Sequence, residues 1–218
     1  MPRLIALLRA INVGRGRVVK MDRLRREFAA MSFSDVETFI ASGNVLFASR
    51  AGNVAALEQR IGERLGGALG YDVGVFIRTP DQLQAIAHFA PFRADEPGPR
   101  LPDNVIFLAA PPRAAARRAV AALRTATDDF RIRGREIYWR RRRKPGTTVF
   151  STVPLEKALG TAFTIRNAGT VTKLAAMCRP DGGKRNAQAA VPVRTHDVGG
   201  GQRRRARRPR RADSRRDH

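Results

Sequence analysis

Residues 3–11 read RLIALLRAI, and this segment decides how the fold begins. A continuous apolar segment of strand length predicts a buried strand, and the turn-forming residues 12–16 (NVGRG) bring it to an end. From Lys20 to Met31 the apolar residues then recur at helical spacing, with charged residues between them. A buried strand followed by an amphipathic helix is therefore the first pair of elements that the sequence predicts.

Four further elements complete a first unit. Two strands are predicted at 36–40 and 45–48, and the segment ASGN between them, residues 41–44, suits a tight reversal. A helix follows over 54–65, and residues 73–78 (VGVFIR) predict another strand. The resulting βαββαβ order is typical of the ferredoxin-like arrangement, in which two helices cover one face of a four-stranded antiparallel sheet.

A second series of elements repeats this pattern. A short helix over 79–88 and a proline-rich connection over 90–103 precede it. Its elements are predicted as strand 104–108, helix 112–124, hairpin strands 130–133 and 136–140, and helices 152–159 and 167–177. No clear strand pattern follows residue 140, so the second unit matches the first incompletely.

Composition limits the classes of protein to which the chain can belong. Apolar residues make up 43% of the 218 residues, which is enough for a packed core. No segment reaches the roughly 18 uninterrupted apolar residues of a membrane span. The single cysteine, Cys178, cannot form an internal disulfide, and with three histidines no zinc cluster is expected. We therefore expect a cytoplasmic protein without a membrane partner, a metal or a cofactor.

Residues 179–218 differ from the rest of the chain. They hold thirteen Lys and Arg against four Asp, so the net charge of +23 divides into +9 for this tail and +14 for the body. Helical and strand periods vanish after Cys178, and Gly, Arg, Pro, Asp and Gln dominate, which predicts a disordered tail. Two interpretations stay open: a reading frame that shifts near Arg179, or a native arm that binds nucleic acid.

Together these patterns predict an α+β protein with three segments. Two ferredoxin-like units with antiparallel sheets covered by helices span residues 1–79 and 80–178, and the second unit includes the connecting helix. The third segment is the disordered, Arg-rich tail over residues 179–218.

Four separated blocks of the sequence carry a resemblance to a known family. They are LLRAINVG at 7–14, Lys20-Met21 with Leu24, TFIASGNVLF at 38–47, and Thr164-Ile165-Arg166-Asn167 with Thr170, Lys173 and Leu174. In this order they resemble the family known as domain of unknown function (DUF) 1697, over about residues 1–178. The resemblance implies two ferredoxin-like subdomains, and it supplies no established activity.

The chain departs from the pattern of that family at three places. The family usually has Gly where Ala10 stands, Gln where Ala41 stands, and a small-residue block with a Lys where residues 144–148 (KPGTT) lie. A function that depends on those groups would not carry over to this chain.

Two groups of polar residues are candidates for binding a small anionic ligand. One lies at the predicted strand end and turns of the first unit and comprises Arg9, Asn12, Lys20, Ser42 and Asn44. The other lies at the start of the last helix and comprises Arg166, Asn167, Thr170 and Lys173. Guanidinium forks, amides and the first N–H groups of a helix bind carboxylates and phosphates. We expect the two groups to meet in a polar cleft between the units, although helix caps, turn closure and a structural ion pair explain the same residues.

A nucleic-acid-binding surface is the competing interpretation. Its residues would stack on bases and contact phosphates, and they are Tyr138, Trp139, Arg140, Arg141, Arg142 and Arg143. An edge strand with protective charge explains the same segment without a function. The first strand carries Leu and Ile where RNA-binding sheets of this fold carry exposed aromatic residues, which favours the anionic ligand.

No pattern identifies catalytic residues. Ser42 has no evident histidine partner, since His88, the only histidine before the tail, is predicted on a different helix. The carboxylates of the first unit are scattered, and their spacing pairs no two of them for acid–base chemistry. The sequence therefore leaves open whether the protein is an enzyme.

Overall fold

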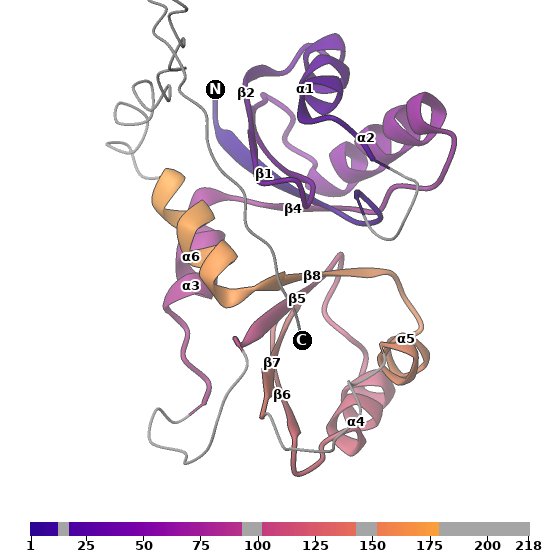
Figure 1. The fold of residues 1–218 in the computed structure, drawn as a ribbon, viewed down its shortest axis with the longest axis vertical. Coiled ribbons are helices and arrows are strands. Elements are labelled where there is room, and N and C mark those ends of the chain that lie inside the picture. Colours follow the sequence, from indigo (N-terminus) through magenta and orange to yellow (C-terminus); the bar gives the residue numbers. More distant parts are fainter. Residues whose placement is uncertain (13–17, 93–101, 143–151, 179–218) are drawn as a thin grey trace, which may run out of the picture. The chain divides into compact units, whose positions relative to one another are not determined.

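A computed structural model describes residues 1–12, 18–92, 102–142 and 152–178 of the chain (Figure 1). All of them fall within one compact unit, Met1–Lys184. In chain order the elements are β1 (Arg3–Leu8), α1 (Met21–Ala30), β2 (Ser34–Phe39), β3 (Asn44–Ala48), α2 (Val54–Leu69), β4 (Val75–Arg78), α3 (Pro80–His88), β5 (Asn104–Leu108), α4 (Ala114–Ala122), β6 (Asp128–Arg133), β7 (Glu136–Arg141), α5 (Val153–Leu159), β8 (Phe163–Asn167) and α6 (Ala168–Met177). The described residues thus form an α+β fold with two four-stranded antiparallel sheets.

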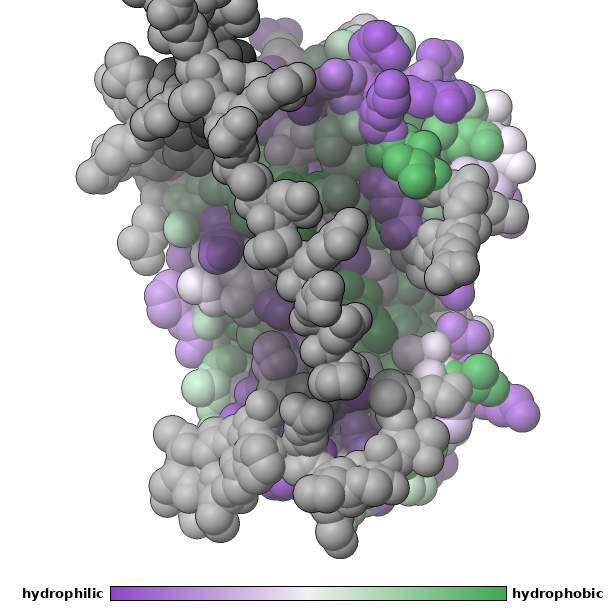
Figure 2. All heavy atoms as spheres, viewed as in Figure 1, coloured by the Kyte–Doolittle hydropathy of each residue, from purple (hydrophilic) through white to green (hydrophobic). Residues whose placement is uncertain are grey.

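The first sheet has the strand order β2-β3-β1-β4, and every neighbouring pair is antiparallel. β1 lies at its centre, and every side chain from Leu4 to Leu8 is buried, which explains an apolar segment without alternation. α1 and α2 pack on one face through side chains that include Phe28 and Ile61. Hydrophilic residues gather at the top of the view near α1, with hydrophobic residues beside them on the side of α2 (Figure 2). This order and connection are those of the ferredoxin-like βαββαβ arrangement.

The second sheet has the matching order β6-β7-β5-β8, again with antiparallel neighbours. α4 and α5 cover one face, where Val120 and Leu155 share an apolar cluster with Ile106. β8 completes the sheet, although the sequence predicted no strand there. Thr164 and Arg166 of β8 are polar but buried, so the usual contrast between apolar buried and polar exposed positions is missing.

α3 and α6 form a layer of two packed helices that both sheets share (Figure 1). One apolar cluster joins Leu7 of the first sheet, Leu83 of α3, Leu174 of α6 and Phe107 of the second sheet. Each sheet thus buries one face against its own two helices and the other face against this common layer. Because the layer is common, the division of the body after residue 79 stays a prediction.

Two strands of the first sheet end earlier than their apolar patterns predict. β1 ends at Leu8 and not at Ile11, because Ala10 and Asn12 take left-handed backbone conformations with φ of 65° and 54°. β2 ends before Ile40, which has a φ of 49° and belongs to the turn. Both departures lie beside the candidate site.

Within the described part of the chain, no helix combines the length and the apolar character that a membrane span needs. In that same part, no three His, Cys, Asp or Glu side chains are grouped so that they could hold a metal ion. The tail over residues 179–218, with the predictions made for it, lies outside the described residues.

Candidate functional site

A groove of about 860 Å³ lies between the end of β1, the β2–β3 turn, the start of α5 and β8. The first sheet supplies Arg9, Asn12 and Ser42 to its wall, and the second sheet supplies Thr164 and Arg166. Residues far apart in the sequence therefore face the same space. Four of them are among the residues predicted to bind an anion.

The first-sheet side of the groove contains strained backbone. Ala10, Asn12 and Ile40 all border the groove, and their φ angles are 65°, 54° and 49°. A left-handed backbone costs a non-glycine residue about 1–2 kcal/mol, and it is exceptional for a β-branched side chain such as Ile40. Ile40 is also 50% exposed. Such strain persists only where surrounding contacts hold it, and it is typical of ligand sites.

Gly43 forms the part of the turn that lies closest to β1. Its φ is +74°, and a Cβ atom there would lie 2.9 Å from the Cβ of Ile11 and 3.1 Å from the Cβ of Leu8. Glycine alone combines that backbone conformation with so close an approach. The carbonyl of Gly43 accepts a hydrogen bond from the backbone N–H of Leu8 at 2.8 Å, so the turn is held against the end of β1.

Arg166 joins the two walls of the groove. It is 6% exposed, and its Nε donates to Oδ1 of Asn44 at 2.6 Å. Its Nη2 donates to the carbonyl of Leu8 at 2.8 Å and to that of Ser42 at 2.9 Å. Its Nη1 donates to Oγ1 of Thr164 at 2.8 Å. All three guanidinium nitrogens are bonded within the protein, and they hold β8 against β1 and the β2–β3 turn.

The charge of Arg166 has no opposite charge beside it in the described part of the chain. Burial lowers the pKa of the Arg166 guanidinium to about 10, and no carboxylate there acts to raise it again. The guanidinium still carries its charge at neutral pH, and a buried charge without a counter-charge is costly. One wall of the groove therefore carries the positive charge of Arg166, and no described carboxylate beside Arg166 balances that charge.

Asn12 and Asn44 use their amides within the protein, and of the two only Asn12 borders the groove. Oδ1 of Asn12 accepts from the N–H of Val19 at 2.6 Å, and its Nδ2 donates to the carbonyl of Ala41 at 2.7 Å. Nδ2 of Asn44 donates to Oγ of Ser42 at 2.9 Å, and the Asn44 side chain is fully buried. These amides therefore hold the loops around the groove in place and are not free to bind a ligand themselves.

Arg9 is the exposed cation of the groove. Its side chain is 45% exposed, and Nη2 lies 3.7 Å from a carboxylate oxygen of Glu156 in α5. An exposed ion pair at that distance contributes little stability. Arg9 can therefore turn its guanidinium toward an anion at little cost.

The other residues predicted to bind the anion lie away from the groove. Lys20 directly precedes α1, Asn167 caps α6 by accepting from the N–H of Thr170 at 3.1 Å, and Lys173 is exposed on α6. None of these four borders the groove. Of the second predicted group, Arg166 alone borders the groove, because its guanidinium bonds to the first sheet.

The segment predicted to bind nucleic acid presents no exposed aromatic platform among its described residues. Trp139 is 4% exposed, stacks on Phe130 and donates from Nε1 to Asp128 at 2.8 Å. Tyr138 is 5% exposed. These rings occupy the two faces of β7 and pack in different apolar clusters, so neither can stack on a base.

The arginines beside those rings are largely engaged by the protein. Arg140 is 5% exposed and donates to Asp103, and the guanidinium of Arg141 lies 4.8 Å from the centre of the Trp139 ring. Arg142 is half-buried, and Arg143 lies outside the described residues.

Sequence reasoning missed the part of the groove that comes from the second unit. Thr152, Glu156, Phe163 and Thr164 border it beside the predicted residues. Alternation within the segment FTIRN was the available signal, because Thr164 and Arg166 fall on one face of a strand. The polar character of that face concealed the strand.

The model of the family described as "Protein of unknown function (DUF1697)" matches residues 1–138. The chain belongs to this family. In this DUF1697 protein the matched residues run from β1 into β7. They include the whole first sheet with its helices, and α3, β5, α4 and β6. The last block of the resemblance, residues 164–174, lies beyond the matched residues.

A solved structure supports the fold of this DUF1697 protein. The conserved bacterial protein SP0830 from Streptococcus pneumoniae is similar, with a TM-score of 0.58 and 21% sequence identity over 82% of this chain and 99% of that chain. At this identity the likeness shows the fold alone. No match was found among the curated proteins.

Proposed function

We propose that the protein binds a small anionic ligand in the groove bordered by Arg9 and Arg166. The observation that carries this proposal is the buried guanidinium of Arg166, which has no carboxylate beside it among the described residues. A negatively charged ligand in the groove would supply the missing counter-charge. The strained backbone on the facing wall supports the same location, because such strain is typical of ligand sites.

The two arginines would act on the anion in different ways. The nitrogens of Arg166 already donate within the protein, so Arg166 would attract the ligand through its charge, which is poorly screened where it is buried. Arg9 is exposed and can donate two parallel hydrogen bonds to a carboxylate or a phosphate. Glu156 would oppose this binding, since its carboxylate competes for Arg9.

The dimensions and residues of the groove favour binding over any one reaction. A volume of about 860 Å³ suits a ligand of metabolite size, since pockets for small molecules span about 300–1,000 Å³. No histidine or cysteine is among the described residues that border the groove. The proposal therefore concerns an anion-binding site, and it leaves the reaction open.

The test is a calorimetric titration of the full chain with pyrophosphate, citrate and a short oligonucleotide. Arg9→Ala is expected to weaken binding of the small anion about tenfold, as the loss of a charge-assisted hydrogen bond of about 1.5 kcal/mol would do. Arg118→Ala is the matched control, because it removes the same charge from an exposed position of α4 that does not border the groove. This control is expected to bind like the unaltered protein.

Both variants retain the basic tail, so any unspecific attraction by residues 179–218 affects them equally. Equal weakening by Arg9→Ala and Arg118→Ala would contradict the groove as the site, as would the absence of binding by any small anion. Oligonucleotide binding that both variants weaken equally would favour the nucleic-acid interpretation instead.

A further inference from the structure

The groove bordered by Arg9 and Arg166 also presents apolar side chains to its interior. Ile40 and Ala41 of the β2–β3 turn border it and are exposed, and Ile165 of β8 borders it and is half-buried. Four large apolar side chains are exposed in the described part of the chain, and Ile40 alone of these four borders the groove. A ligand in the groove therefore meets apolar surface as well as charge.

Ile40 keeps a backbone conformation that isoleucine rarely adopts. Its φ is 49°, and glycine or asparagine takes such a value at a lower cost than a β-branched residue. Because Ile40 is 50% exposed, burial within the protein offsets only part of this cost. Strained residues of this kind cluster at ligand sites. Contact with the apolar part of a ligand accounts for an isoleucine at this position.

Ile40 also lies close to the buried charge of the groove. The carbonyl of Ser42, two residues further along the same turn, accepts a hydrogen bond from Nη2 of Arg166 at 2.9 Å. Consecutive Cα atoms are about 3.8 Å apart, so the Cα atoms of Ile40 and Ser42 are separated by at most about 7.6 Å. An apolar group attached to an anion beside Arg166 therefore needs only a few carbon atoms to reach Ile40.

The charges that border the groove favour an anion with a single charge. Among the described residues at its border, the charged side chains are Arg9, Glu156 and Arg166, which leave one net positive charge. A carboxylate supplies one negative charge, whereas a phosphate monoester carries about 1.5–2 at neutral pH. A carboxylate therefore balances the groove more closely than a phosphate does.

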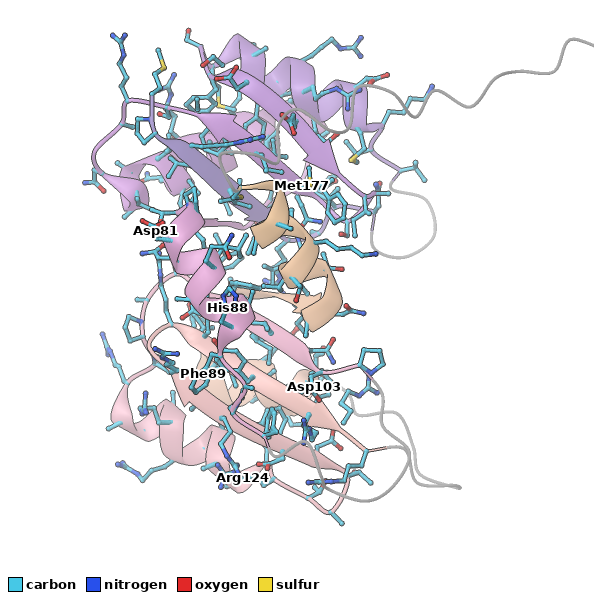
Figure 3. All side chains as sticks on the ribbon, turned by 90° about the vertical axis from the view of Figure 1, so that its left-hand side faces the viewer. Asp81, His88, Phe89, Asp103, Arg124 and Met177 are labelled. Atoms are coloured by element: carbon cyan, nitrogen blue, oxygen red, sulfur yellow. The ribbon has the colours of Figure 1, made fainter. Side chains whose placement is uncertain are left out.

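The wall that β8 supplies is held against the first sheet from two sides. Nη2 of Arg166 fastens β8 to the carbonyl of Leu8, and α6 follows β8 directly. α6 ends at Met177 beside the first sheet (Figure 3), where the carbonyl of Met177 accepts from Nη1 of Arg3 at 3.5 Å. The groove is thus formed before a ligand binds, and little binding free energy is spent on ordering it.

We propose that the anion bound in the groove is a carboxylate that carries a short apolar chain, and that Ile40 contacts this chain. This inference rests on the proposed function and names the class of ligand. The carboxylate lies beside Arg9 and Arg166, and the chain extends along the turn to Ile40. Ile40 is then a specificity-determining residue, because it favours an amphiphilic carboxylate over a bare anion.

NMR titration of the full chain with hexanoate, acetate and hexanamide tests the chain and the charge separately. Hexanoate carries both, acetate lacks the chain, and hexanamide keeps the chain without the charge. Hexanoate is expected to bind about tenfold more tightly than acetate, as the burial of about two methylene groups would give. It is also expected to bind about tenfold more tightly than hexanamide, which offers no charge to the arginines.

Ile40→Asn tests the contact, because asparagine tolerates the left-handed backbone and removes the apolar side chain. This variant is expected to weaken hexanoate binding about fourfold, the ratio for one buried methylene group, and to leave acetate binding unchanged. Ile40→Leu is the matched control, because it keeps an apolar side chain at the same position. It is expected to retain the binding of hexanoate.

The inference is overturned if hexanoate binds no more tightly than acetate or hexanamide, or if Ile40→Asn weakens hexanoate and acetate alike. In these cases the proposed function still stands where Arg9→Ala weakens the binding of both anions. If neither anion binds, or if Arg9→Ala and Arg118→Ala weaken binding equally, the proposed function fails as well. If Ile40→Asn does not fold, the three probes with the unaltered protein decide alone.

Discussion

Ala10 connects backbone strain with the groove at the scale of one residue. Its φ of 65° is one that glycine adopts freely and that alanine adopts only at a cost. Ala10 directly follows Arg9, the exposed cation of the groove, and both residues border the groove. The strain therefore lies beside the side chain that we propose to contact the ligand.

Ala10→Gly is expected to raise the free energy of unfolding by about 0.5–1 kcal/mol. Relief of the left-handed strain exceeds the entropy that glycine adds to the unfolded chain. Urea unfolding of the full chain measures the change. Ala29→Gly, on the exposed side of α1, is the control and is expected to lower the free energy of unfolding by about 1 kcal/mol. A loss of stability in Ala10→Gly would contradict the positive φ.

A second single residue, Tyr138, makes the stability of the protein depend on pH. Burial raises the pKa of its phenol from 10.0 to about 12, so the folded protein keeps a proton that the unfolded chain releases. The contribution of Tyr138 to stability is complete below pH 10.0 and is lost as the pH rises toward about 12. Tyr138→Phe is therefore expected to lose stability less steeply than the unaltered protein in this range. Urea unfolding at several pH values measures both slopes, and equal slopes would contradict the burial of the phenol.

At the scale of elements, β8 depends on Arg166. The guanidinium of Arg166 satisfies the carbonyls of Leu8 and Ser42 and the side chain of Asn44, which all belong to the first sheet. These acceptors are buried or half-buried. Without the guanidinium, Asn44 Oδ1 and the carbonyl of Ser42 lose the donor shown for them, while the carbonyl of Leu8 keeps the Thr164 hydroxyl at 3.2 Å. One side chain thus fixes an edge strand of one sheet to the end of another sheet.

Arg166→Ala is expected to lower the free energy of unfolding by about 2–4 kcal/mol, because these acceptors lose the guanidinium at once. Arg9→Ala removes an exposed arginine of the same groove and is expected to change this free energy by less than about 0.5 kcal/mol. Chemical unfolding of both variants gives the comparison. Similar stabilities for the two would contradict the role of Arg166 as a link between sheets.

The elements of the first unit could be predicted because apolar residues mark their buried faces. The segment from Leu4 to Leu8 and the spacing of Leu24 and Phe28 are examples. β8 could not be predicted in this way, because its buried face carries polar residues. The partners of Arg166 were also beyond prediction, since Arg166 and Asn44 are 122 residues apart and meet only when both sheets have formed.

At the scale of the whole body, a buried ion pair also links the sheets. Arg78 of β4 is fully buried, and its Nε donates to Oε1 of Glu136 in β7 at 2.7 Å. Its Nη2 donates to the carbonyl of Leu108 in β5 at 2.9 Å. Burial lowers the pKa of Arg78, and the nearby charge of Glu136 acts against that effect. The two sheets share one apolar layer, and Arg78 and Arg166 also link them. We therefore expect the two sheets to unfold together.

Glu136→Gln is expected to lower the free energy of unfolding by about 3 kcal/mol, because it leaves the charge of Arg78 buried without a partner. Glu156→Gln neutralises an exposed carboxylate and is expected to change the free energy of unfolding by less than about 0.5 kcal/mol. Urea unfolding of both variants gives the comparison.

In the unaltered protein, circular dichroism and tryptophan fluorescence are expected to follow one common unfolding transition. Two separate transitions in the unaltered protein would show that the sheets unfold independently.

Arg166 itself gives the most direct test of anion binding in the groove. The Nε–Hε signals of the full chain, labelled with ¹⁵N-arginine, can be followed by NMR during a titration with pyrophosphate and assigned with Arg166→Lys, Arg9→Lys and Arg118→Lys. The signals of Arg166 and Arg9 are expected to shift together and to saturate with one dissociation constant, while that of Arg118 stays in place. If pyrophosphate binds and the Arg166 and Arg9 signals do not move, the anion does not occupy the groove.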